Sequence, residues 1–304
     1  MSKLAFLFPG QGSQFAGMGK SLAERYPVAK QTFEEADASL GFSLSQMCWA
    51  GPEEDLKRTE NTQPALLTVS TAACRVLREQ GHRPDLVAGH SLGEYSALVA
   101  AGALGFADAL QLVRKRGRYM QEAVPEGVGA MAAILRLPGG KLDEILAEAA
   151  QGEVVAAANL NSADQVVIAG HAAAVARASE LAKAAGAKRV VALPVSAPFH
   201  CPLMKPAQDR LRPDLHATPF RDLDVPLVNN WQARLIRTAA EARLGLIEQI
   251  PNPVRWLESI RLLEAQAVTQ AFEAGPGAVL SGLVRAVAPS IECRRFGEAS
   301  DFDK

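Results

Sequence analysis

The five residues Gly89-His90-Ser91-Leu92-Gly93 separate a short apolar segment, residues 85–88, from an Ala- and Leu-rich segment, residues 92–101. We interpret the first segment as a buried strand and the second as a helix. A serine at such a corner, with glycine two positions away on each side, is typical of a nucleophile elbow. The tight turn favours glycine at the flanking positions and presents the hydroxyl at a helix N-terminus, where negative charge is stabilised. The sequence predicts Ser91 as a nucleophile and the Leu92 backbone N–H as an oxyanion donor, with a chance match as the alternative.

The composition is that of a globular protein without a charge bias. The chain has 304 residues, of which 48% are hydrophobic and 21% charged, and its formal net charge is −1. Such a charge gives no reason to expect binding to nucleic acid or to a membrane surface. The four cysteines are scattered with no Cys-x-x-Cys pair, which argues against a zinc site and for a reducing compartment. We find no membrane-spanning run and no signal peptide, and we expect a cytoplasmic protein.

A glycine-rich loop follows the first apolar strand, residues 4–8, and reads Pro9-Gly10-Gln11-Gly12-Ser13-Gln14. It does not match a dinucleotide-binding pattern, because Phe15 stands where the third glycine belongs. A phosphate-binding P-loop fails as well, because Gln14 occupies the first required glycine position. We therefore expect either a plain turn or a flexible loop that brings Gln11 close to a site.

The main body of the chain alternates between strands and helices, which indicates a parallel sheet covered on both faces. The expected helices span residues 22–40, 63–80, 92–101, 106–124, 204–215, 239–250, 253–265 and a last segment after residue 277. The expected strands span residues 4–8, 85–89, 225–229 and 269–273.

A different rhythm interrupts this body after Pro125-Glu126-Gly127. Strands at 128–137, 154–160, 165–169 and 188–194 and helices at 142–150 and 172–185 give the order βαββαβ of a ferredoxin-like unit. We expect an inserted subdomain over residues 127–196, with residues 1–126 and 197–304 forming the catalytic body. A cleft between the two units is a plausible place for a substrate.

The helix expected at residues 106–124 carries four cations, and Arg116 differs from the other three. Arg114, Lys115 and Arg118 point away from the apolar stripe, whereas Arg116 lies only about 60° from it. A guanidinium on that edge needs an anionic partner if its head is covered. On the pattern alone, an arginine that reaches solvent or pairs with a structural carboxylate is slightly favoured over a functional one.

A serine nucleophile needs a base, and His200 is the best placed of the five histidines. It lies in the Pro-bounded loop 196–202, at the junction of the two expected units, and loops on a rigid scaffold commonly carry catalytic groups. Gln249, at the end of its expected helix, could orient the imidazole by offering a carbonyl. A carboxylate normally does that work, and no acidic residue between Ser91 and His200 stands out as the partner.

Five motifs together resemble the malonyl-CoA:acyl carrier protein transacylase family over nearly the whole chain, from Phe6 to about Phe296. They are Pro9-Gly10-Gln11-Gly12-Ser13-Gln14, Gly89-His90-Ser91-Leu92-Gly93-Glu94, Gln121-Glu122-Ala123-Val124-Pro125-Glu126-Gly127, Ala197-Pro198-Phe199-His200 and Asn252-Pro253-Val254-Arg255-Trp256. The resemblance implies an α/β-hydrolase-like body with a ferredoxin-like insertion, the order derived above. It implies malonyl transfer from CoA to the phosphopantetheine thiol of acyl carrier protein through a malonyl-serine ester.

The resemblance also assigns roles to individual residues. It implies Ser91 as nucleophile, His200 as general base, and Gln11 with the Leu92 N–H as oxyanion hole. It implies Gln249 as the residue whose carbonyl holds the imidazole, and Arg116 as the group that grips the malonyl carboxylate, a bidentate fit that lysine cannot copy. We hypothesise that an uncharged partner at Gln249 makes His200 a less persistent base toward water. Asn159 and Asn161 are expected near the site.

The resemblance implies no bound cofactor or metal, with malonyl-CoA as the substrate, and we expect a monomer. Two alternatives share this constellation: an acyltransferase that loads a polyketide synthase, and an acyl-thioester hydrolase or esterase. Arg116 argues against the hydrolases, because neutral acyl groups need no carboxylate grip, and Phe199 resembles the malonyl-type pattern. A non-catalytic carrier-binding protein is the weakest alternative, since serine, base and arginine are all present.

Overall fold

The computed structural model describes residues 2–195 and 197–303 and contains two separate sheets. The larger sheet has the strand order β10-β9-β1-β2-β7-β8. Its strands are β1 (Lys3–Phe8), β2 (Leu86–Gly89), β7 (Leu227–Val228), β8 (Leu235–Ile236), β9 (Val268–Ala274) and β10 (Glu292–Phe296). All neighbours pair in parallel except β8, which is antiparallel to β7. The predicted α/β body with a parallel sheet is confirmed.

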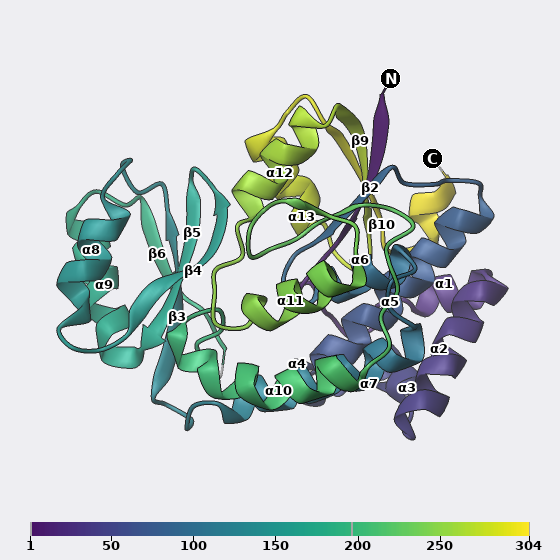
Figure 1. Cartoon of the computed structure of the whole chain (residues 1–304), viewed down its shortest axis with the longest axis horizontal. Coiled ribbons are helices and arrows are strands. Elements are labelled where there is room, and N and C mark those ends of the chain that lie inside the picture. Colours follow the sequence, from purple (N-terminus) through teal and green to yellow (C-terminus); the bar gives the residue numbers. More distant parts are fainter. Residues whose placement is uncertain (1, 196, 304) are drawn as a thin grey trace.

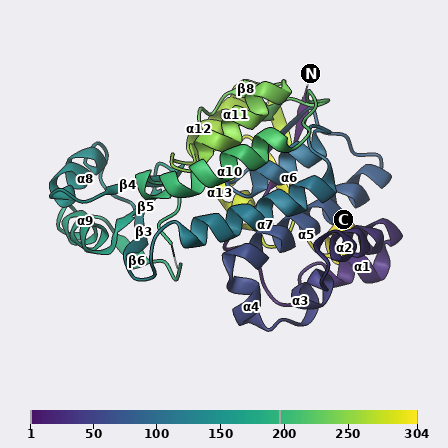
Figure 2. The same ribbon diagram turned by 60° about the horizontal axis from the view of Figure 1, so that its bottom comes forward.

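Helices cover both faces of this sheet (Figures 1 and 2). They are α1 (Lys20–Arg25), α2 (Pro27–Leu40), α3 (Leu44–Ala50), α4 (Glu53–Lys57), α5 (Thr59–Glu79), α6 (Gly93–Ala100), α7 (Phe106–Glu122), α10 (Lys205–Ala217), α11 (Ala239–Gln249), α12 (Trp256–Ala265) and α13 (Val279–Val287). Side chains alternate along β1, so that Phe6 and Phe8 join the core under α5 and α6. Ala5 and Leu7 face the opposite core, under α12 and α13. This two-sided burial explains why β1 is apolar throughout.

The smaller sheet has the order β4-β5-β3-β6 and is antiparallel throughout. It is built from β3 (Gly129–Leu135), α8 (Leu142–Ala150), β4 (Val155–Ser162), β5 (Gln165–His171), α9 (Ala172–Ala184) and β6 (Arg189–Ala192). This is the chain order and strand order of the predicted ferredoxin-like unit. Figure 1 shows the small sheet with α8 and α9 at one end of the molecule. The predicted limits at 127 and 196 stay a prediction, and residue 196 lies outside the described residues.

Strand β4 ties the small sheet to the body. The Val254 N–H donates to the Ala158 carbonyl, and the Leu160 N–H donates to the Val254 carbonyl, each at 2.9 Å. Asn159 of β4 therefore pairs with Val254, which lies outside both sheets, as an isolated parallel bridge. This contact places the inner edge of the small sheet against the segment that follows Gln249.

Several elements differ from the prediction. The single helix expected at residues 22–40 is two helices, because Tyr26 is extended before Pro27 and Pro27 begins α2. The short helices α3 and α4 and the edge strands β8 and β10 were not predicted. Each is too short for a periodic pattern to stand out from its surroundings. Among the described residues no helix is both long and apolar enough to cross a bilayer.

Candidate active site

Ser91 stands at a sharp turn between β2 and α6, as the elbow pattern predicts. Its φ of 51° lies in the left-handed region, which a non-glycine residue adopts only at an energetic cost. The flanking glycines are required by close approach. A Cβ on Gly89 would lie 1.9 Å from the Gly93 carbonyl oxygen, and a Cβ on Gly93 would lie 2.0 Å from the Phe8 carbonyl oxygen. Glycine at position 89 therefore lets the turn close on itself, and glycine at position 93 lets it pack against β1.

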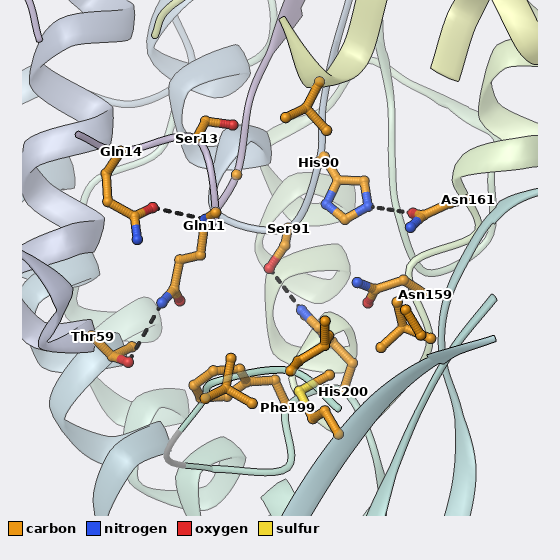
Figure 3. Close-up of a pocket in the computed structure, with 18 of the residues that line it drawn as sticks. Gln11, Ser13, Gln14, Thr59, His90, Ser91, Asn159, Asn161, Phe199 and His200 are labelled. Atoms are coloured by element: carbon orange, nitrogen blue, oxygen red, sulfur yellow. Dashed lines mark hydrogen bonds between the residues drawn. The ribbon is translucent and has the colours of Figure 1, made fainter. Parts of the chain in front are cut away.

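His200 meets this serine from a remote part of the chain, the return from the small sheet to α10. Its Nε2 lies 2.7 Å from Ser91 Oγ, and its Nδ1 lies 2.9 Å from the backbone carbonyl oxygen of Gln249 (Figure 3). A carbonyl only accepts, so Nδ1 carries the ring proton and Nε2 is free to accept from the serine hydroxyl. This tautomer is the one a general base needs.

Burial keeps that imidazole neutral. His200 is buried, and burial, followed by the positive charge of Arg116, lowers its pKa to about 3. Because this pKa lies well below neutral pH, the imidazole stays unprotonated at neutral pH. Its Nε2 lone pair therefore remains available to Ser91.

Arg116 lies fully buried beside the nucleophile. Its Nη2 donates to Ser91 Oγ at 3.2 Å and to Gln249 Oε1 at 2.8 Å, and its Nη1 donates to Gln63 Oε1 at 2.7 Å. Within residues 2–195 and 197–303 its side-chain partners are neutral and it is fully buried, so both structural alternatives weighed for it, solvent and a paired carboxylate, are wrong. Burial lowers its pKa, yet a guanidinium stays charged in proteins. A buried cation without a carboxylate partner in the described residues thus touches the serine oxygen.

Gln249 contacts the imidazole through its backbone and not through its side chain. The side-chain Oε1 accepts from Arg116, and Nε2 donates to Ser91 O at 3.0 Å and to Glu94 Oε2 at 2.7 Å. The partner of the imidazole is thus the uncharged backbone carbonyl and not the side-chain amide. That an uncharged partner makes His200 a less persistent base toward water stays a prediction. Any residue at this position could offer the backbone carbonyl. The side-chain amide instead contacts Arg116, Ser91 and Glu94.

Gln11 and Leu92 follow neighbouring parallel strands. Phe8 of β1 pairs with Gly89 of β2, so the two loops leave the sheet side by side. A Cβ on Gly10 would lie 2.5 Å from the His90 carbonyl oxygen, which shows how tightly these loops pack. The Gln11 side chain turns toward Thr59, with Nε2 and Oγ1 3.4 Å apart (Figure 3). The Gln11 side chain is thus directed at Thr59 and not at Ser91.

A cavity of about 480 Å³ opens in front of Ser91, between the body and the small sheet. Its walls include Gln11, His200 and Phe199 from the body and Asn159 and Asn161 from β4. The predicted cleft between the two units is confirmed. His90 turns away from Ser91 and contacts Asn161, with Nε2 2.8 Å from Oδ1 (Figure 3). No group of three or more His, Cys, Asp or Glu side chains in the described residues is placed to hold a metal ion.

Three buried polar residues around the site were missed. Gln63 accepts a hydrogen bond from Arg116. Asn230 accepts from the Ser91 N–H at 2.7 Å and donates to Gly89 O at 2.7 Å. Glu94 accepts from Asn230 and Gln249. Asn230 follows strand β7, next to β2, and a polar residue at that sheet edge is a signal that could have found it. The sequence signal for Glu94 was weaker, because it consisted only of a single acidic residue in an apolar helix.

The fold and the serine, imidazole and guanidinium define an acyl-transferring enzyme with a serine nucleophile. Residues 5–281 match the sequence model described as "Acyl transferase domain". The chain is 49% identical over 301 residues to "Malonyl CoA-acyl carrier protein transacylase" of Escherichia coli strain K12, covering 99% of this chain and 97% of that protein. The protein of the same name in Bacillus subtilis strain 168 is 54% identical over 288 residues, covering 94% and 91%. The chain belongs to the malonyl-CoA:acyl carrier protein transacylase family.

Solved structures agree with this assignment. The acyl carrier protein S-malonyltransferase of Vibrio cholerae O1 has a TM-score of 0.97 at 48% identity, with 99% of each chain covered. A malonyl-transacylase solved in complex with its type II polyketide synthase acyl-carrier protein has a TM-score of 0.97 at 47% identity, covering 99% of this chain and 98% of that one.

Proposed function

We propose that this protein transfers a malonyl group from malonyl-CoA to the phosphopantetheine thiol of acyl carrier protein, in fatty-acid synthesis. The observation that carries the proposal is the position of Ser91 Oγ, which lies 2.7 Å from His200 Nε2 and 3.2 Å from Arg116 Nη2. A nucleophile held between a base and an unpaired cation suits an acyl donor that carries its own negative charge.

The reaction proceeds in two exchanges. Ser91 Oγ attacks the thioester carbonyl while its proton passes to His200 Nε2, and the tetrahedral intermediate expels the CoA thiolate, which takes that proton. The carrier thiol then gives its proton to His200 and attacks the malonyl ester. Ser91 leaves as the alcohol, with the proton returned from His200. The thioester is already activated, so the exchange needs no metal or nucleotide.

Two groups stabilise the charges that this chemistry creates or brings in. The backbone N–H groups of Leu92 and Gln11 would donate to the oxyanion of each tetrahedral intermediate, supported by the N-terminus of α6. Arg116 would bind the malonyl carboxylate through parallel hydrogen bonds. Phe199 lines the cavity beside His200, and its ring would crowd a branched acyl group.

The same proposal includes acyl carrier protein as the acceptor, a location in the cytoplasm and a monomeric state. All four cysteines are free, which supports a reducing cytoplasm. A monomer stays a prediction.

The test is mass spectrometry of the intact protein after brief exposure to malonyl-, methylmalonyl- and acetyl-CoA. We expect a malonyl adduct that Ser91→Ala abolishes and that passes to the carrier protein on its addition. Arg116→Ala should lose the preference for malonyl over acetyl, by about tenfold or more for a charge-assisted bond, whereas Arg118→Ala, an exposed cation on the same helix, should keep it. An unchanged preference in Arg116→Ala would remove the argument.

Loading of a polyketide synthase is the second candidate, and the 47% identical transacylase seen with a polyketide carrier protein favours keeping it. The two candidates use the same chemistry and differ in the carrier. Transfer rates to a fatty-acid carrier and to a type II polyketide carrier, measured side by side, separate them.

A further inference from the structure

The buried carboxyl group of Glu94 has no part in the mechanism above. Glu94 lies on α6, three residues after the nucleophile, and is 1% exposed. Burial raises its pKa to about 7. If the helix only had to pack, an apolar residue at this position would be more stabilising, because burial of a carboxyl group has a desolvation cost.

Both hydrogen bonds of this carboxyl group are made by one oxygen. Its Oε2 accepts from the Asn230 backbone N–H at 3.0 Å and from Gln249 Nε2 at 2.7 Å. Its Oε1 has no hydrogen-bond partner in the described part of the chain. The carboxyl group is thus directed at two residues, and the Gln249 contact is the shorter.

Gln249 is placed between two groups with opposite requirements. The Arg116 guanidinium can only donate, and it does so to Gln249 Oε1 at 2.8 Å. An ionised carboxylate can only accept, and Glu94 does so from Gln249 Nε2. Only one of the two orientations of the amide satisfies both neighbours, and a flipped amide would turn its NH₂ group toward the guanidinium.

We propose that Glu94 is a positioning residue: by accepting from Gln249 Nε2 it fixes the amide so that Gln249 Oε1 holds the Arg116 guanidinium beside Ser91. The proposal rests on the proposed function for its consequence, the preference for an acyl group with a free carboxylate. The contact itself stands on the geometry alone.

Two substitutions at this position separate the acceptor from the packing. Glu94→Gln keeps one acceptor oxygen without the charge, and Glu94→Met keeps the length of the side chain without an acceptor. Asp301→Asn is the matched control, because Asp301 is also a buried carboxylate, accepts from the backbone N–H groups of Gly297 and Glu298, and does not line the cavity. For each variant we would measure the rates at which malonyl-CoA and acetyl-CoA acylate Ser91.

We expect Glu94→Met to lower the malonyl rate about tenfold or more relative to the acetyl rate, the worth of a hydrogen bond to a charged group. Glu94→Gln should fall between that variant and the wild type, and Asp301→Asn should keep the wild-type ratio. A fall of both rates in the same proportion, an unchanged ratio, or a raised preference for malonyl would overturn the proposal. If Glu94→Met does not fold, the ratio in Glu94→Gln decides.

A second measurement does not depend on the substrate. Melting temperatures of Glu94→Gln, Gln249→Met and the double variant form a cycle, and we expect the double variant to lose less than the sum of the two singles. Additive losses would show that the two side chains do not support each other. A wild type that takes no malonyl group would instead contradict the proposed function, and the cycle would still judge the contact.

Discussion

Gln249→Glu replaces the side-chain NH₂ group by an oxygen. The side chain thereby changes from a hydrogen-bond donor to an acceptor at three contacts. In the wild type, Gln249 Nε2 donates to Ser91 O at 3.0 Å, to Glu94 Oε2 at 2.7 Å and to Asn230 Oδ1 at 3.3 Å. A carboxylate oxygen in its place meets three acceptors and donates to none. The other oxygen keeps the Arg116 contact and turns it into a buried ion pair.

The size of the effect follows from these contacts. A buried group left without its partner costs about 1–3 kcal/mol, and the new ion pair with Arg116 offsets part of the sum, so we expect a net loss of about 2–4 kcal/mol at pH 8. At lower pH the two neighbouring carboxyl groups share a proton, which restores a donor between them. The pKa of Glu94 is already raised to about 7, and a second carboxylate raises it further.

The sign of the pH dependence is fixed by that raised pKa. The folded variant binds a proton that the unfolded chain has lost, so this contribution to stability is present at acidic pH and disappears as the pH rises through the folded-state pKa. Because the wild type loses its own Glu94 proton near pH 7, the destabilisation by Gln249→Glu should be about 1.4 kcal/mol greater at pH 8 than at pH 6.

Urea denaturation at both pH values measures the loss, and acylation by malonyl-CoA and acetyl-CoA measures its consequence. Malonyl acylation should fall more than acetyl acylation, because the new carboxylate competes for Arg116. The control is Gln208→Glu, since Gln208 is also buried and donates to one backbone carbonyl, that of Ile247, at 3.0 Å. This control should keep the acyl preference. Wild-type stability of Gln249→Glu at pH 8, or intact malonyl transfer with faster hydrolysis, would refute the reasoning.

Two further predictions concern the elbow and the base. Gly93→Ala should lower the melting temperature by at least about 4 °C, because its Cβ would lie 2.0 Å from the Phe8 carbonyl oxygen, whereas Gly282→Ala, with open space around it, should not lower it. A tolerated Gly93→Ala would contradict the packing. His200, with its pKa lowered to about 3, binds no proton in the folded state where the unfolded chain does, so folding loses stability as the pH falls below about 6.5. His200→Gln should remove about 2 kcal/mol of the loss between pH 7 and pH 5 in urea denaturation, and an equal loss in both proteins would count against it.

The parts of the site that the sequence predicted are those with a local signature. The elbow needs only five adjacent residues, and its glycines follow from sterics within that turn. The position of Arg116 near the apolar stripe followed from helical periodicity, although the pattern could not say whether the covered guanidinium was paired. The inserted unit followed from the order of its strands and helices, since βαββαβ has few compact solutions.

The contacts that the sequence could not predict join residues far apart in the chain. Glu94 meets Asn230 across 136 positions and Gln249 across 155. Sequence alone shows one acidic residue in an apolar helix, and such a residue can equally face solvent. The backbone carbonyl of Gln249 is harder still, because a main-chain acceptor leaves no trace in the residue type.

The attachment of the small sheet explains why a base can come from the junction. His200 lies between β6 of the small sheet and α10 of the body in the chain, and its imidazole contacts Ser91. The carbonyl of Gln249 that orients the imidazole lies five residues before Val254, the residue that pairs with β4. The segment that attaches the small sheet to the body is thus the same segment that supports the His200 imidazole. Residues 249–254 therefore carry both the carbonyl that orients the base and the attachment of β4, whose Asn159 and Asn161 line the cavity.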